Sequence, residues 1–97
     1  MIIISKSIIR EFGLKHADAH DALNDWYDIV SGADWSNLND IKQTFNSVDY
    51  VGNERYVFNI KGNRYRLITM IFLDIRTIFI RFIGTHAEYN KIDATTI

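Results

Sequence analysis

The spacing of apolar residues divides this chain into a helical first half and a strand-forming second half. Between residues 16 and 30, apolar side chains recur with a period of about 3.6 and aspartates occupy the opposite side, which predicts an amphipathic helix. The same spacing predicts a short helix that is capped by Ser5 or Ser7 and ends near Gly13. A third helix is predicted over residues 38–45, after an asparagine cap.

Beyond residue 46 the apolar period changes to two, which is typical of strands. Residues 55–60, 64–73 and 77–83 are each rich in β-branched and aromatic side chains. They predict a three-stranded antiparallel meander, and the apolar run Ile2–Ile4 is a candidate fourth strand. We therefore expect an α+β fold in which N-terminal helices pack on a twisted antiparallel sheet of three to four strands.

Composition limits the chain to a single domain over residues 1–97, because a second core would need about 50 residues of its own. The hydrophobic fraction of 47% supplies a core without covalent staples. The absence of cysteine excludes disulfides, CxxC redox motifs and thiolate metal sites. No apolar run approaches the roughly 20 residues of a membrane span or the pattern of a secretory signal. We therefore expect a cytoplasmic protein that has no membrane partner.

The formal net charge of −1 is the average of two unlike halves. Residues 1–50 hold 4 basic and 8 acidic side chains, whereas residues 51–97 hold 7 basic and 4 acidic ones. Such an asymmetry is a weak indication of a polyanionic partner. The acidic half is predicted to be helical and to face away from that partner.

Three arginines of the second half are predicted to share one face of the sheet. If Asp74 and Ile75 form a two-residue hairpin loop, Arg66 lies opposite Ile83, and Arg81 lies opposite Ile68. Because side chains alternate along a strand, Arg64, Arg66 and Arg81 then project from the same face, where an anion would relieve their repulsion. The competing interpretation is that these arginines pair with the acidic helices, and a shift of one residue would move Arg81 to the other face.

The segment that follows the last strand holds candidate chemistry. It runs Gly84-Thr85-His86-Ala87-Glu88-Tyr89-Asn90-Lys91 and lies at the end of the sheet where the arginines are expected. Histidine can accept and donate a proton near neutral pH, so His86 is a candidate acid or base. A capped or surface histidine without a function is the alternative. Gly84 is expected to let the backbone bend sharply before it.

Other patterns give weaker indications. His16 and His20 have the spacing of an HExxH zinc site, but the glutamate of that motif is replaced by Ala17, so no metal site is expected. The aromatic residues Phe72, Phe79 and Phe82 are expected to belong to the core rather than to a platform for stacked bases. Both tryptophans are also expected in the core.

Two segments of the second half are similar to a known family. Tyr56 to Leu67 and Ile80 to Tyr89 resemble the HigB family of bacterial toxins, within the RelE-like group. The resemblance extends back through Leu23-x-x-Trp26, Ala33-Asp34-Trp35 and Asp40-Ile41-Lys42, so it covers nearly the whole chain. The family pattern has an aspartate after the tyrosine, whereas this chain has Asn90, which argues against an acid or base at that position.

The resemblance implies a toxin of a type II toxin–antitoxin system that cleaves mRNA on translating ribosomes. It further implies a helix-turn-helix antitoxin of the HigA type as partner, and neither a metal nor a cofactor is expected. Arg66 and Arg81 are then expected to hold the scissile phosphate, with His86 as general acid or base and Tyr89 assisting it or stacking on a base. The residues expected to hold the RNA backbone are Lys61, Arg64 and Lys91.

Two other classes remain open from the sequence. A non-catalytic module that binds RNA or the ribosome would use the same arginines without cleaving a bond. A protein-interaction domain would use them to meet acidic partners. His86 distinguishes the three classes, because a binder has little use for a titrating group beside its phosphate contacts.

Overall fold

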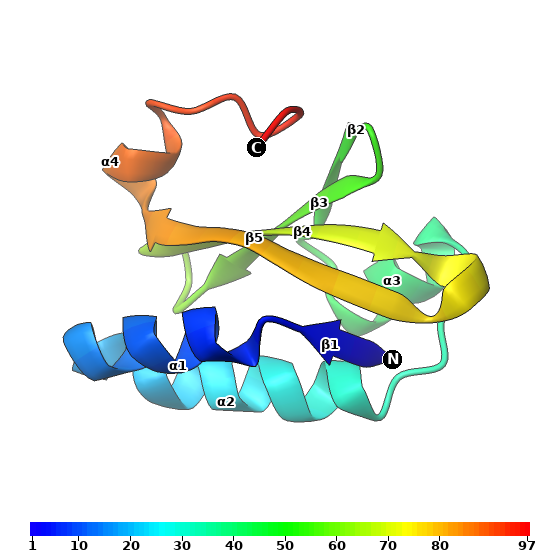
Figure 1. Cartoon of the computed structure of the whole chain (residues 1–97), viewed down its shortest axis with the longest axis horizontal. Helices are drawn as coiled ribbons and strands as arrows, with labels where there is room; N and C mark the ends of the chain where they lie inside the picture. Colours follow the sequence, from blue (N-terminus) through cyan, green and yellow to red (C-terminus); the bar gives the residue numbers. More distant parts are fainter.

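The computed structural model describes residues 1–97 and has four helices packed on one five-stranded sheet (Figure 1). The longest helix has 15 residues, and no helix combines the length and apolarity that a bilayer crossing requires. The elements in chain order are β1 (Ile2–Ile4), α1 (Lys6–Lys15), α2 (Ala17–Ser31), α3 (Leu38–Thr44), β2 (Asp49–Gly52), β3 (Arg55–Ile60), β4 (Tyr65–Phe72), the 3-10 turn η1 (Leu73–Ile75), β5 (Thr77–Thr85) and α4 (His86–Tyr89).

The strands lie in the order β1-β5-β4-β3-β2. Neighbours are antiparallel except β1, which pairs in parallel with β5. The α+β class is confirmed, but the sheet has five strands and not three to four. The additional strand is β2, which has only four residues and contains a register shift before Gly52, so it is too short for a two-residue period to be visible.

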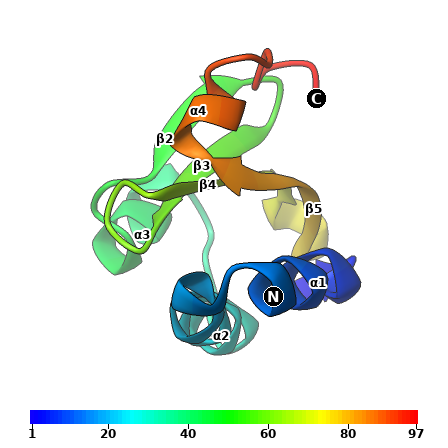
Figure 2. The same ribbon diagram turned by 90° about the vertical axis from the view of Figure 1, so that its left-hand side faces the viewer.

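The two faces of the sheet are covered differently (Figures 1 and 2). Helices α1, α2 and α3 cover one face, and the main core of 16 buried residues lies beneath them. Helix α4 and the chain that follows it lie on the opposite face, over a smaller cluster formed by Val57, Ile68 and Ala94. The acidic helices and the terminal helix are therefore separated by the thickness of the sheet.

The predicted helices are present, with differences at their ends. Helix α1 continues two residues past Gly13, because this buried glycine packs against His20 of α2 and does not end the helix. Ser5 does precede α1, but it has a positive φ of 76° and its side chain makes no capping hydrogen bond. Asn37 caps α3 as predicted, since its side-chain oxygen accepts from the backbone N–H of Asp40.

Both tryptophans are buried as expected. Trp26 lies edge-on to Phe58, and the indole N–H of Trp35 donates to the hydroxyl of Thr44 at 3.1 Å. The aromatic stripe of the last strands differs from the prediction. Phe72 and Phe79 are only half-buried and meet edge to face on the α4 side of the sheet, outside the main core.

Candidate functional site

The register of β4 and β5 decides which arginines meet. Phe72 pairs with Thr77 and Thr69 pairs with Ile80, as the hairpin prediction requires, although the connection has four residues instead of two. The register then shifts by one, so that Ile68 pairs with Phe82. This β-bulge leaves Arg81 as the extra, unpaired residue of β5 and not opposite Ile68, and it pairs Arg66 with Gly84 and not with Ile83 as predicted.

Arg66 and Arg81 lie on the α4 face of the sheet. Arg66 lies over the ring of Tyr89 in α4, and Arg81 contacts the chain that follows α4. The prediction that these two arginines share a face is therefore confirmed. The two arginines are separated along the strand direction, because Arg66 of β4 pairs with Gly84, which lies three residues beyond Arg81 in β5.

Arg64 does not join this pair. It belongs to the four-residue turn between β3 and β4, where Lys61 and Gly62 have positive φ, and not to β4 itself. The alternation of strand side chains therefore does not apply to it. Its guanidinium binds the carboxylate of Asp18 in α2 at 2.5 Å, on the helical side of the sheet. For Arg64 the competing interpretation, pairing with an acidic helix, is the correct one.

Asp18 is held by two donors at once. The hydroxyl of Tyr65 donates to one carboxylate oxygen and Arg64 to the other, each at 2.5 Å. These contacts, first the hydroxyl and then the guanidinium, lower the pKa of Asp18 below its ordinary value of 3.8. The same carboxylate raises the pKa of Tyr65. The arrangement fixes the start of β4 to the start of α2.

Arg66 is held by neutral groups. Its Nη1 donates to the side-chain oxygens of Asn59 and Asn63, and its guanidinium carbon lies 5.7 Å from the centroid of the Tyr89 ring. It forms no ion pair with an aspartate or glutamate. Because both hydrogen bonds use Nη1, the Nη2 and Nε donors remain for a ligand. Such a planar, fixed guanidinium can bind two oxygens of a phosphate.

Helix α4 begins directly at the end of β5 and is held by a capping box. Thr85 accepts from the backbone N–H of Glu88, and the Glu88 carboxylate accepts from the backbone N–H of Thr85 at 2.8 Å. The backbone contact, followed by the hydroxyl, lowers the pKa of Glu88. The role expected for Gly84 was a sharp bend, but its φ is not positive. The structure needs a glycine there because a Cβ would lie 2.5 Å from Cζ of Phe82 and 3.1 Å from the Glu88 carboxylate.

His86 is the first residue of α4 and is exposed. Its backbone N–H donates to the carbonyl of Arg64, which joins α4 to the turn before β4. Its Nδ1 lies 3.2 Å from the side-chain amide nitrogen of Asn90, one helical turn further on. This contact occupies Nδ1, so Nε2 is the ring nitrogen left without a hydrogen-bond partner.

Lys61 and Lys91 are both exposed, one in the turn before β4 and one after α4. The structure thus brings Arg66 and Tyr89 into contact and places His86 on the same short helix. Arg81 lies on the same face, and Arg64 lies on the other. Sequence reasoning missed Arg55 of β3, which shares a hydrogen-bond acceptor with Arg81. The alternation of side chains along β3 could have predicted its position, because Arg55 and Val57 are two residues apart and therefore face the same side of the sheet.

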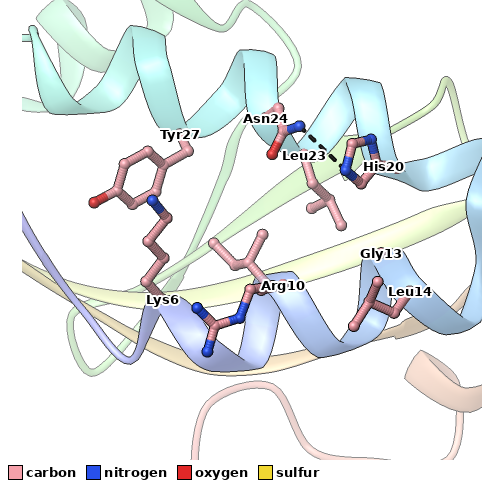
Figure 3. A pocket seen from close by; sticks show the side chains of 9 residues that line it. Lys6, Arg10, Gly13, Leu14, His20, Leu23, Asn24 and Tyr27 are labelled. Atoms are coloured by element: carbon pink, nitrogen blue, oxygen red, sulfur yellow. Dashed lines mark hydrogen bonds between the residues drawn. The ribbon is translucent and has the colours of Figure 1, made fainter.

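The two histidines of the helical layer do not form a site together. His16 precedes α2 and stacks on Phe12 with ring centroids 4.2 Å apart, whereas His20 is exposed beside Asp21 and Asn24. A pocket of about 230 Å³ lies between α1 and α2, where Lys6 reaches the ring of Tyr27 (Figure 3). It shares no residue with the site on the α4 face.

Comparison with known proteins identifies the class. A family model for the RelE-like toxic component of a toxin–antitoxin system, HigB_toxin, matches residues 19–92. The mRNA interferase HigB of Escherichia coli O6:H1 is 31% identical over 94 residues, which are 95% of this chain and 91% of that protein. The mRNA interferases HigB of Escherichia coli K12 and of Shigella flexneri are each 37% identical over 57 residues, or 56% of this chain and 54% of theirs. The chain belongs to the HigB family of toxins.

Proposed function

We propose that this chain is an endoribonuclease that cleaves mRNA on translating ribosomes, in the cytoplasm, and is silenced by a helix-turn-helix antitoxin of the HigA type. The observation that carries the proposal is the pair Arg66 and Arg81 on the α4 face. Neither forms an ion pair with an aspartate or glutamate, although the chain is rich in aspartates. By contrast, Arg64 and Arg76 are neutralised by Asp18 and Asp34.

The proposed reaction is attack of a ribose 2′-hydroxyl on the adjacent phosphate. It requires a base for the hydroxyl proton, cations for the charge that develops on phosphate, and an acid for the departing 5′-oxygen. Arg66 and Arg81 would bind the phosphate, and His86 would transfer a proton through Nε2. Tyr89 positions Arg66 through its ring, and its hydroxyl is a second candidate for proton transfer.

The backbone of the RNA would extend beyond this centre. Lys61 and Lys91, which are both exposed, are proposed to contact neighbouring phosphates. Arg64 would do so only by exchanging Asp18 for a phosphate, so its contact with RNA requires the Arg64–Asp18 ion pair to break. The antitoxin is proposed to cover or distort the α4 face.

The experiment is to express the chain with and without the neighbouring antitoxin and to map RNA ends. Discrete cuts inside coding regions that leave 5′-hydroxyls, present only without the antitoxin, are the expected result. Growth arrest with intact message would favour the non-catalytic RNA- or ribosome-binding module. A complex with antitoxin that is inactive while the α4 face stays open would show that silencing works in another way.

A further inference from the structure

The sheet face that carries α4 has an apolar row that stays open to solvent. Side chains alternate along a strand, and Ile78 and Ile80 of β5 are buried under the helices, so Phe79 points to the α4 face. The register places Ile4 of β1 on one side of Phe79 and Met70 of β4 on the other. Ile4 is exposed, and Met70 and Phe79 are partly exposed. The row therefore crosses three strands without being covered.

Phe72 of β4 adds a second ring to this row. It lies two residues from Met70 and directly before η1, at the end of the β4–β5 hairpin away from α4 (Figure 1). Its ring meets the Phe79 ring edge to face, with centroids 5.8 Å apart and planes at 82°. In such a pair the partner covers only one ring face, so ring surface remains for a third group. We call Phe72 and Phe79 the aromatic pair.

The charge beside the aromatic pair is positive. The strands β1, β3, β4 and β5 contain no aspartate or glutamate. Arg81 is exposed and lies two residues beyond Phe79 on the same face, about 6–7 Å along β5. Only its Nε donates a hydrogen bond within the chain, so Nη1 and Nη2 remain as donors. A ligand that stacks on Phe79 therefore has a guanidinium within reach.

The chemistry of this surface selects the ligand. Single-stranded RNA offers an aromatic base and a phosphate in every nucleotide, and proteins bind it with aromatic rings for the bases and cations for the backbone. An apolar protein surface could also cover the row. It would, however, bury Arg81 at the edge of the contact without a counter-charge, which costs free energy. The arrangement therefore favours RNA over an apolar protein partner.

We propose that the aromatic pair stacks an unpaired base of RNA, whose adjoining phosphate binds Arg81. Taking RNA as the ligand, and Arg81 as a phosphate contact, rests on the proposed function. Along β5 the order is Phe79, Arg81 and then His86 in α4, so the stacked base lies on the side of Arg81 away from His86. The aromatic pair thus adds a subsite for the nucleotide next to the cleaved bond. It accepts only an unpaired base, because a base inside a helix has its faces covered by its neighbours.

Binding is measured with a six-nucleotide 2′-O-methylated RNA, which lacks the attacking hydroxyl and stays intact. Phe79→Leu keeps the apolar volume but removes the ring, and it is expected to weaken binding about tenfold, as for the loss of one stacked base. Phe79→Tyr keeps the ring and should bind like the parent chain. Phe12→Leu is the matched control, because Phe12 is a partly exposed phenylalanine of α1 on the other layer.

The dependence on salt separates stacking from charge. Phe79→Leu should leave the slope of log affinity against log salt unchanged, because it removes no phosphate contact. Arg81→Gln should lower this slope by about 0.7, the value for one contact on a single strand. The unaltered chain supplies a test that needs no variant. When 2-aminopurine replaces each base of the oligonucleotide in turn, its fluorescence should be quenched on binding at the position that stacks.

Equal affinities for Phe79→Leu and the parent chain, or an equal loss in Phe12→Leu, overturn the stacking subsite. So does a 2-aminopurine signal that changes at no position, even if Phe79→Leu fails to fold. A variant that binds RNA normally but sediments differently from the parent chain assigns the row to a protein contact instead. The proposed function fails separately: a chain that binds the oligonucleotide through Phe79 but cuts no unmodified RNA is a non-catalytic binder, and the stacking subsite stands.

Discussion

The guanidinium of Arg66 lies over the ring of Tyr89, with its central carbon 5.7 Å from the ring centroid. This contact joins β4, the central strand of the site, to α4, the helix that begins with His86. A cation at this distance from an aromatic face is attracted by the ring quadrupole. Tyr89 is therefore placed to orient the guanidinium of Arg66, whatever its hydroxyl does.

Tyr89→Phe and Tyr89→Leu separate these two roles. If the ring orients Arg66, the phenylalanine variant should cleave RNA at close to the parent rate, whereas the leucine variant should lose about two- to fivefold, the value of an exposed cation–π contact. The measurement is the single-turnover cleavage rate of an RNA substrate at saturating protein. Equal and large losses in both variants would instead assign proton transfer to the hydroxyl.

Arg81→Ala and His86→Ala should each abolish growth inhibition while the chain stays folded. Both side chains are exposed, so their removal leaves the core intact. Loss of one contact to a developing oxyanion costs about 3–4 kcal/mol, or two to three decades in rate. The measurements are colony growth and cleavage rate, with circular dichroism as the control for folding. A folded Arg81→Ala variant that remains toxic would remove Arg81 from the phosphate contact.

Gly84→Ala should lower both stability and activity. The new Cβ would lie 2.5 Å from the Phe82 ring, so the ring or the start of α4 must shift. Such overpacking costs about 1–3 kcal/mol, visible as a lower midpoint of thermal unfolding. Gly32→Ala is the matched control, because its nearest neighbour is 3.8 Å away and its φ is −90°. Equal midpoints for the two variants would contradict the packing role of Gly84.

The shared face of Arg66 and Arg81 could be predicted because both ends of the hairpin keep the side-chain alternation. The bulge at Arg81 could not, since nothing local in Ile80-Arg81-Phe82 distinguishes a bulged residue from a regular one. The bulge nevertheless keeps Arg81 on the predicted face. The failure at Arg64 has a different cause: the predicted strand begins at residue 64, whereas the four-residue turn between β3 and β4 includes this arginine.

Contacts between distant parts of the chain were the other source of error. The Arg64–Asp18 pair joins residues that are 46 positions apart in the sequence. The hydrogen bond from Arg55 to Ile97 joins residues that are 42 positions apart. Local periodicity carries no information on such pairs. The charge asymmetry was useful in a coarse way, because the acidic helices do lie on the sheet face opposite α4. Two arginines of the second half nevertheless pair with the first half: Arg64 with Asp18 of α2, and Arg76 with Asp34 of the loop between α2 and α3.

Asn90→Asp tests how His86 is oriented. The amide nitrogen of Asn90 lies 3.2 Å from Nδ1 of His86, so a carboxylate at this position would stabilise the protonated ring. The limb of the pH–rate profile that reports His86 should move to higher pH, by about one unit. Asn24→Asp is the matched control, since Asn24 contacts His20 in the helical layer. A profile that moves equally in both variants, or in neither, would exclude His86 as the titrating group.

Asp18 makes stability depend on pH. The Tyr65 hydroxyl and the Arg64 guanidinium lower the pKa of this carboxyl below 3.8 in the folded chain. Folding thus favours the charged carboxylate. Its contribution to the free energy of unfolding is fully present above the pKa of Asp18 in the unfolded chain, and it is lost as the pH falls through the pKa of Asp18 in the folded chain.

Asp18→Asn should therefore unfold at a lower temperature than the parent chain at pH 7, and the difference should shrink as the pH falls from about 5 to below 3. The lowered pKa values of Glu88 and Asp93 act in both chains and cancel in this difference. Asp25→Asn, an exposed aspartate of the same helix that forms no ion pair, is the control and should change the midpoint little at any pH. A difference between Asp18→Asn and parent that stays constant down to pH 2 would mean that the charge on Asp18 does not contribute to folding.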